Sequence, residues 1–219
     1  YPQEQGSLEA GVKYLVQSAV GSVLILLAIA ITYAYAGTLQ LDGIRARFVE
    51  LNPALIGSGV LFIIGFGVKA ALVPMHTWLP DAHAQAPSGI SAMLSGIVIE
   101  AGLVAMLRAL FALGAEATWW GVLLMGFGAI NMFLGNLLAL RQQQIKRLLA
   151  FSSVAQVGYM LAGIGVGLAY HQPIAIAGGM FHLFTHALMK GLAFLAVGAL
   201  LYALVISQHQ HTPLTLDDV

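Results

Sequence analysis

Residues 173–206 read PIAIAGGMFHLFTHALMKGLAFLAVGALLYALVI, a long apolar run whose middle carries two histidines and one lysine. A membrane-spanning helix needs about 20 mostly apolar residues, so this run is long enough to cross a bilayer. An ionisable side chain at bilayer depth is costly, and by default it faces a cavity or a partner. The stretch therefore predicts a transmembrane helix that contributes to a buried polar site.

Working outward from this run, the same length and polarity criteria identify five more apolar stretches, which short polar or proline-containing segments separate. These are residues 10–36, 53–75, 88–113, 117–140 and 146–170. The segment 76–87, with two prolines and the Pro80-Asp81 turn, is interpreted as a loop. We predict an all-α polytopic transmembrane helix bundle of about six spanning helices, forming one transmembrane domain over residues 1–219.

The composition indicates that lipid is the solvent. Of the 219 residues 59% are hydrophobic and only 8% are charged, whereas soluble domains carry about 25% charged residues. The net charge is zero and there is no basic run, which argues against nucleic acid as a partner. Cysteine is absent, so residues 1–219 offer no disulfide, iron–sulfur ligand or zinc thiolate.

The chain starts without methionine and ends on a segment that reads like the opening of another connection, so we expect a fragment of a longer subunit. Six spans place both termini on one side of the membrane. Basic residues favour that side by four to three, which predicts cytoplasmic termini. The residues on that side are Lys13, Arg141, Lys146 and Arg147, against Arg45, Arg47 and Arg108 on the other.

Three charged residues lie inside the predicted spans and away from the span ends. Glu100 is about 12 residues into its span, roughly 18 Å deep at the rise of a helix. Lys190 lies near the middle of its span, and each such charge costs at least about 2.5–3.5 kcal/mol at the bilayer centre. Lys69 lies nearer the cytoplasmic end, where a lysine could instead extend its ammonium to the interface.

His182, His186 and Lys190 are spaced i, i+4, i+8 and therefore share one helix face. Two histidines one turn apart could bind a metal, but no carboxylate accompanies them and Lys190 would repel a cation. A proton relay explains the pattern better, because histidine titrates near neutral pH. Either histidine could also be a hydrogen-bonded core residue.

Ser152, Gln156 and Tyr159 share a face of the fifth predicted span, with Ser153 beside them. Such a face could hold ordered water for proton transfer or supply interhelical hydrogen bonds, and both interpretations stay open. Asn131 and Asn136 in the fourth span favour the second interpretation.

Three ordered blocks carry a family resemblance. They are KAALVPMHTWLPDAH at 69–83, followed by APS at 86–88 and SAMLSG at 91–96; IKRLLAFSS at 145–153; and FHLFTHALMKGL at 181–192. They resemble the antiporter-like proton-translocating subunits of respiratory complex I (NADH-quinone oxidoreductase), membrane-bound hydrogenases, formate hydrogenlyase and Mrp-type cation/proton antiporters. The chain looks like the middle part of that inverted-repeat fold. Many relatives carry a lysine where this chain has Glu100.

The resemblance implies a role for each candidate residue. The proton relay comprises Lys69, Glu100, His182, His186 and Lys190; its supporting polar residues are Ser152, Ser153, Gln156 and Tyr159; the cytoplasmic loop contributes His76, Trp78, Asp81, His83 and Lys146. It also implies that the helix bearing Lys69 is interrupted and opens Lys69 to a water-filled cavity. In the family, a helix preceding this region bears a glutamate that pairs with the lysine at this position.

We therefore expect a proton-translocating membrane subunit of a redox-driven complex, with no catalytic centre or metal of its own. Quinone, flavin or Fe–S groups are expected only in partner subunits. Its partners would be lipid, homologous antiporter-like subunits and other membrane subunits, in the energy-conserving plasma membrane of a prokaryote. The alternatives are an Mrp-type Na⁺/H⁺ antiporter subunit, a structural membrane subunit, and a metal-dependent intramembrane enzyme.

Overall fold

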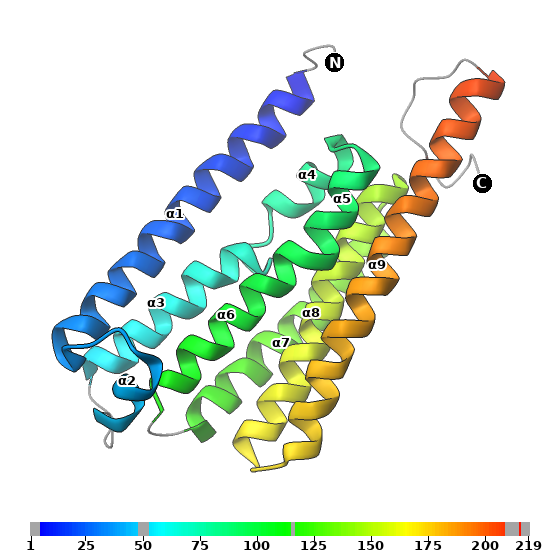
Figure 1. The fold of residues 1–219 in the computed structure, drawn as a ribbon. Coiled ribbons are helices and arrows are strands. Elements are labelled where there is room, and N and C mark those ends of the chain that lie inside the picture. The colour runs from blue at the N-terminus through cyan, green and yellow to red at the C-terminus, as the bar shows by residue number, and fades with distance from the viewer. Residues whose placement is uncertain (1–4, 48–52, 115–116, 209–214, 216–219) are drawn as a thin grey trace.

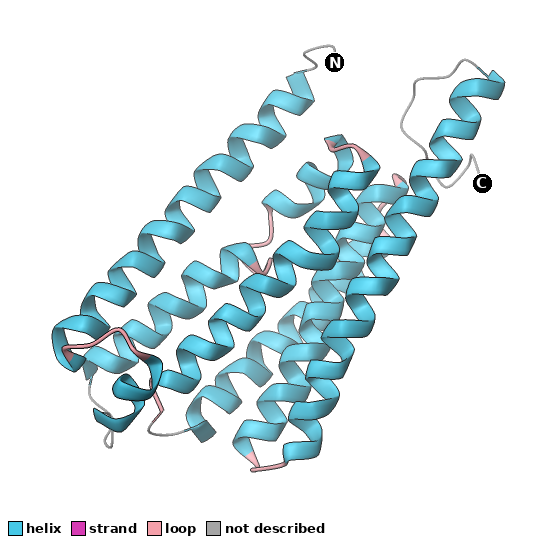
Figure 2. Ribbon diagram, viewed as in Figure 1, coloured by secondary structure: helices cyan, strands magenta, loops and turns pink. Residues whose placement is uncertain are grey.

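The computed structural model describes residues 5–47, 53–114, 117–208 and 215, and within these ranges the chain folds into packed helices joined by short loops (Figures 1 and 2). The elements are α1 Gln5–Ala36, α2 Leu41–Arg47, α3 Pro53–Lys69, α4 Trp78–Gln85, α5 Ser88–Met93, the π-helix η1 Leu94–Val98, α6 Ile99–Ala112, α7 Ala117–Leu140, α8 Ile145–Ala169 and α9 Pro173–Gln208. Of the two terminal segments, residues 1–5 and 212–219, only Gln5 and Thr215 lie among the described residues.

Among the described residues, five continuous helical stretches are long and apolar enough to cross a membrane: Gln5–Ala36, Ser88–Ala112, Thr118–Leu140, Ile145–Ala169 and Pro173–Leu204. The shorter apolar helix α3 accompanies them. The prediction of an all-α transmembrane bundle is therefore confirmed, with α5, η1 and α6 forming one continuous stretch. The assignment of residues 1–219 to a single domain stays a prediction.

The region after α3 differs from the prediction. We predicted a helix over 53–75 and a loop over 76–87, but α3 ends at Lys69 and the predicted loop contains the helix α4. Pro74 has no N–H to donate and its ring blocks a continuing helix, and Ala71 adopts a left-handed φ of 55°. The chain then resumes a helix at Trp78, so α3 and α4 form an interrupted helix (Figure 1).

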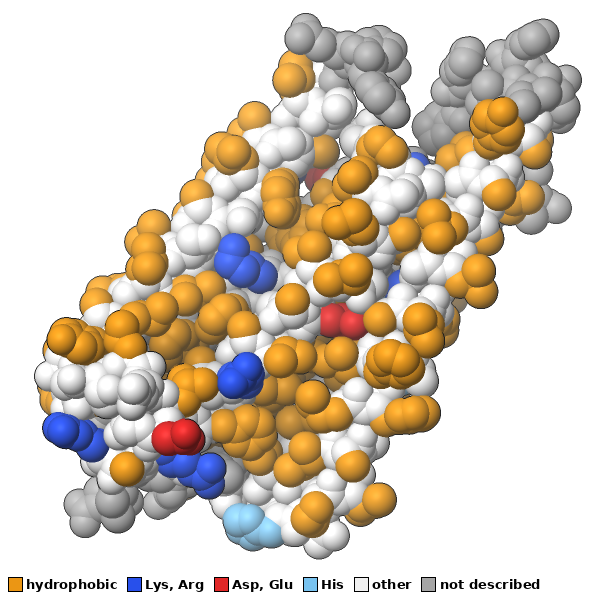
Figure 3. All heavy atoms as spheres, viewed as in Figure 1, with side chains coloured by type: hydrophobic (Ala, Val, Ile, Leu, Met, Phe, Trp, Pro, Cys, Tyr) orange, Lys and Arg blue, Asp and Glu red, His pale blue; other side chains and the backbone are white. Residues whose placement is uncertain are grey.

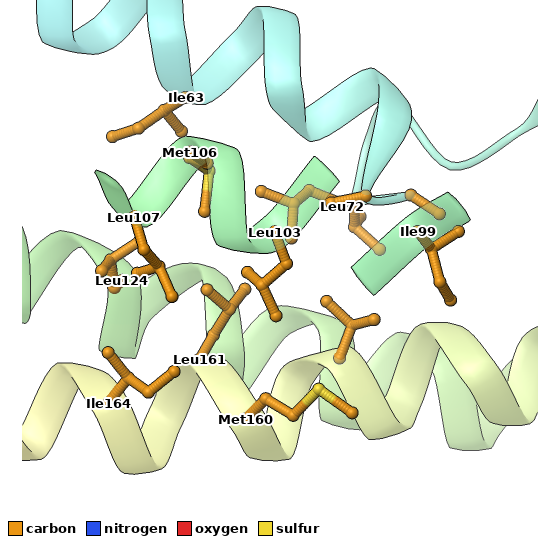
Figure 4. Close-up of a cluster of buried hydrophobic side chains, with 14 of the residues drawn as sticks. Ile63, Leu72, Ile99, Leu103, Met106, Leu107, Leu124, Met160, Leu161 and Ile164 are labelled. Atoms are coloured by element: carbon orange, nitrogen blue, oxygen red, sulfur yellow. The ribbon is translucent and has the colours of Figure 1, made fainter. Parts of the chain in front are cut away.

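The core lies where α3, α6, α7 and α8 meet, as the close-up in Figure 4 shows for Ile63, Leu103, Leu124 and Leu161. Glycines let α7 and α8 approach closely: a Cβ on Gly128 would lie 2.7 Å from Ala162 N and 2.8 Å from the Gly158 carbonyl oxygen. Small residues serve this purpose in membrane bundles, where the hydrophobic effect does not drive helix association.

The outer surface is largely apolar. Figure 3 shows hydrophobic side chains over most of the visible face, with few charged groups between them. On α9, for example, Phe181 is 68% exposed and Leu192 is 71% exposed. Such a surface matches a lipid environment, in which exposed apolar groups carry no solvation penalty.

Candidate functional site

A buried carboxylate–imidazole pair connects α6 and α9. Oε1 of Glu100 lies 2.8 Å from Nδ1 of His186. Both residues are buried, with relative exposures of 5% and 0%. A carboxylate is tolerated in such a place only with a close hydrogen-bonding partner, and His186 supplies it. This pairing joins two candidates that are 86 positions apart in sequence.

The π-helix η1 ends at Val98, two positions before Glu100. A π-turn inserts an extra residue into a helix and so rotates the residues that follow it. Gly96 in η1 packs against α9, since a Cβ on Gly96 would lie 2.9 Å from the carbonyl oxygen of Ala187. The absent side chain allows α9 to come close at the level where Glu100 contacts His186.

The polar face of α9 continues on both sides of this pair. Nε2 of His182 lies 2.7 Å from Oε1 of Gln156 on α8, and the rings of His182 and His186 are 6.3 Å apart. Nζ of Lys190 donates to the carbonyl oxygen of Leu149 on α8 at 3.0 Å, and Lys190 is only 2% exposed. The three α9 residues spaced i, i+4, i+8 therefore all have polar partners inside the bundle.

Serine hydroxyls extend the polar contacts toward η1. The hydroxyls of Ser95 and Ser153 are 2.6 Å apart, and Ser153 also donates to Leu149 O at 3.0 Å. Leu149 O therefore accepts from both Ser153 and Lys190. Sequence reasoning placed Ser153 beside the relay but missed Ser95, although its i, i+4 spacing from Ser91 was visible.

Two of the predicted supporting residues are not part of this cluster. Tyr159 is 47% exposed, and its hydroxyl accepts from Asn136 on α7 at 3.3 Å. Ser152 makes no side-chain hydrogen bond with any residue in the described ranges. Gln156 and Ser153 are therefore the members of the predicted polar face of α8 that reach α9 or η1.

Lys69 lies at a second position, at the C-terminal end of α3, where the helix dipole favours a positive charge. Its Nζ donates to the hydroxyl of Ser18 on α1 at 3.4 Å. Both residues line a cavity of about 360 Å³ between α1, α3 and α6. No hydrogen bond or ion pair among the described residues joins Lys69 to Glu100 or Lys190.

Asp81 and Lys146, both assigned to the predicted cytoplasmic loop, help to hold α4 in place. Asp81 accepts from Lys13 of α1 at 2.8 Å and from Arg147 of α8 at 3.0 Å. Lys146 donates to the carbonyl oxygen of Ala86, just after α4, at 2.9 Å. Residues 78–85 therefore form a helix that ion pairs and hydrogen bonds hold between α1 and α8, and not a loop.

The aromatic and histidine side chains of the same segment are buried. Trp78 and His83 lie in α4 and not in the predicted loop, whereas His76 lies in the turn before this helix. Trp78 is 2% exposed, and its Nε1 donates to Val68 O across the interruption at 2.7 Å. His83 is fully buried and stacks on Phe194 of α9 at 4.5 Å, while His76 contacts Phe151 edge-on. Neither ring nitrogen of His83 has a hydrogen-bond partner among the described residues.

The chemistry that this arrangement can support is proton exchange. Carboxylate, imidazole and amine groups accept and release protons, and all three kinds lie along one face of α9 and the facing turn of α6. Within the described ranges, no three histidine, aspartate or glutamate side chains gather as ligands of a metal ion.

Comparisons with known proteins agree with these observations. A family model described as NADH:quinone oxidoreductase/Mrp antiporter, TM, matches residues 1–213. Hydrogenase-4 component B of Escherichia coli is 41% identical over 210 residues, covering 91% of this chain. The match covers 31% of that relative, so the chain spans about a third of its length.

Two solved structures are also similar. One is the membrane-bound sulfane sulfur reductase, an archaeal respiratory membrane complex, with a TM-score of 0.83 and 33% identity over 91% of this chain and 41% of the other. The second is the Mrp complex from Dietzia sp. DQ12-45-1b, with a TM-score of 0.81 and 26% identity. The match covers 88% of this chain and 35% of the other. The interrupted helix and the polar face of α9 thus occur in a chain whose fold matches subunits of membrane complexes.

Proposed function

We propose, from the premise that this chain belongs to the NADH:quinone oxidoreductase/Mrp antiporter transmembrane family, that it relays protons as part of an antiporter-like membrane subunit. The complex would be redox-driven, with its driving reaction in partner subunits. The observation that carries this proposal is the buried contact of Glu100 with His186, one helical turn from Lys190. Groups that exchange protons at bilayer depth are rare and mark ion pathways by default.

The relay would have two parts. Lys69, in its cavity between α1, α3 and α6, would receive a proton near the interruption. Glu100, His186 and Lys190 would form the second part, with His182 and Gln156 beside them. Because the described residues do not join the two parts directly, transfer between them requires water or side-chain movement.

Reconstitution of the complete complex with Lys190→Ala tests this proposal. We expect the driving reaction of the partner subunits to continue while proton translocation is lost. Lys13→Ala is the matched control, because Lys13 lies on the surface and pairs with Glu9 and Asp81. Normal translocation by Lys190→Ala would contradict the relay. Loss of assembly with normal flux per assembled complex would favour a purely structural subunit.

A cation/proton antiporter subunit is the second candidate. It is favoured by the similarity to the Mrp complex and by Glu100, a buried carboxylate. Sodium-dependent collapse of a pH gradient in everted vesicles would support it. The proposed location is the energy-conserving plasma membrane of a prokaryote, with homologous antiporter-like subunits as neighbours. Quinone, flavin and Fe–S groups would belong to those partners.

A further inference from the structure

The interruption between α3 and α4 exposes backbone groups that need partners inside the bundle. After Lys69, the amide of Ala70 bonds to Phe66 O at 2.7 Å and that of Leu72 to Gly67 O at 2.8 Å, which closes the last turn of α3. The amide of Val73 has no such local partner, and Pro74 has no amide to offer. An unpaired backbone group buried in an apolar core costs about 1–3 kcal/mol.

Asn131, from the middle of α7, supplies the missing partner. Its Oδ1 accepts from Val73 N at 2.9 Å, and its Nδ2 lies 3.5 Å from Ala71 O and donates to Val154 O of α8 at 3.2 Å. Asn131 is fully buried. The Asn131 amide therefore contacts the interruption on both sides of Leu72 and also bonds to α8. This role is more specific than the interhelical hydrogen bond that the sequence indicated.

The bound segment begins two residues after Lys69. A shift of Ala71 or Val73 must therefore move the end of α3, which carries the lysine. On its other side, Lys69 is confined by α6, because a Cβ on Gly102 would lie 3.1 Å from Lys69 Cβ. The lysine is thus fixed between α6 and the segment held by Asn131, with its ammonium against Ser18.

We propose that Asn131 is a positioning residue that holds the interruption of the helix in place and keeps the Lys69 ammonium in its cavity against Ser18. Its importance for transport rests on the proposed function of Lys69, but the placement itself can be tested without any transport assay. The Asn131 side chain would act on the relay only through the backbone that follows Lys69.

A thiol at position 18 can report on the ammonium. A nearby lysine favours the thiolate, which is the reactive form, so Ser18→Cys should react with methyl methanethiosulfonate faster when Lys69 is in place. Residues 1–219 contain no cysteine. The measurement would use the full subunit in its complex, with any cysteine outside these residues replaced. Lys69→Met added to Ser18→Cys gives the rate without the ammonium.

Adding Asn131→Leu to Ser18→Cys should slow the reaction roughly three- to tenfold, to the rate found with Lys69→Met. Asn131→Asp keeps an oxygen for Val73 N and should give an intermediate rate, even if the leucine variant does not fold. Asn136→Leu is the matched control on the same helix, because its amide contacts Tyr159 at 3.3 Å and not the interruption. An unchanged rate with Asn131→Leu, where Lys69→Met slows the reaction, would overturn the proposal.

Hydrogen exchange at the Val73 amide provides the second measurement. It tests the proposal by itself in the case where Lys69→Met does not change the reaction rate of the thiol. We expect faster exchange at Val73 in Asn131→Leu, which removes the acceptor of that amide, with exchange in α3 and α7 unchanged. Exchange as slow as in the native protein would overturn the proposal. If both measurements agree with it but Lys69→Met transports protons normally, the proposed function fails while the positioning stands.

Discussion

Glu100 on α6 and His186 on α9 form a buried contact of 2.8 Å between Oε1 and Nδ1, and this contact joins the two helices at the level of the polar cluster. Neither lysine of the relay is the partner of Glu100. Lys190 is instead held by Leu149 O at 3.0 Å, and Lys69 faces Ser18. Glu100, Lys190 and Lys69 thus each have a different hydrogen-bond partner in the bundle.

Removing the partner of His182 should slow the relay without stopping it. In Gln156→Leu, the imidazole loses the amide oxygen at 2.7 Å and can turn away from α8. We expect proton translocation in reconstituted vesicles to slow roughly two- to tenfold, equivalent to about 0.4–1.4 kcal/mol. Asn136→Leu removes an amide at the exposed side of α7 and should transport normally. Equal rates in the native protein and Gln156→Leu would place His182 outside the relay.

The ion pairs that join Asp81 of α4 to α1 and α8 should contribute measurably to the stability of the fold. Asp81→Asn weakens the contacts with both Lys13 and Arg147, whose side chains are 43% and 40% exposed, so screening by solvent limits the loss to about 1 kcal/mol. The unfolding midpoint, followed by tryptophan fluorescence, should fall more at low than at high ionic strength. Asp81→Glu keeps the negative charge and should be more stable than Asp81→Asn, close to the native protein. A fall that salt does not change would argue against an ionic origin.

Two glycines on one helix should respond differently to the same substitution. Gly128→Ala places a methyl group 2.7 Å from Ala162 N, so it must separate α7 from α8 and should destabilise the bundle by about 1–3 kcal/mol. Gly126→Ala meets nothing within 4 Å and should be neutral or slightly stabilising, because alanine favours helix. Unfolding in mixed detergents measures both. Similar stabilities of the two variants would mean that α7 and α8 are not closely packed here.

The sequence predicted the spanning helices well, because apolar length alone decides them. It also placed His182, His186 and Lys190 on one face, since helical spacing fixes that geometry. It did not locate α4: the short helix has ordinary polar residues, and its burial depends on α1, α8 and α9, which are distant in sequence. His83 therefore looked like a loop residue although it stacks on Phe194.

The partners of the polar residues were harder still. The contact between Glu100 and His186 lies just after the π-helix η1, which has no simple apolar periodicity to reveal it. Ser95 was missed for the same reason, because the phase of its face changes within that turn. Asn131 was interpreted as an ordinary interhelical hydrogen bond, since nothing local marks Val73 N as a group that needs a distant acceptor.

Proton translocation by Glu100→Gln, in the complete complex and per turnover of its driving reaction, tests the buried relay most directly. Glutamine can keep a hydrogen bond to His186 but cannot exchange a proton, so we expect a folded complex that turns over and translocates far fewer protons. Glu9→Gln is the control, because that carboxylate is exposed and pairs with Lys13 at the surface. Full translocation by Glu100→Gln would contradict the account.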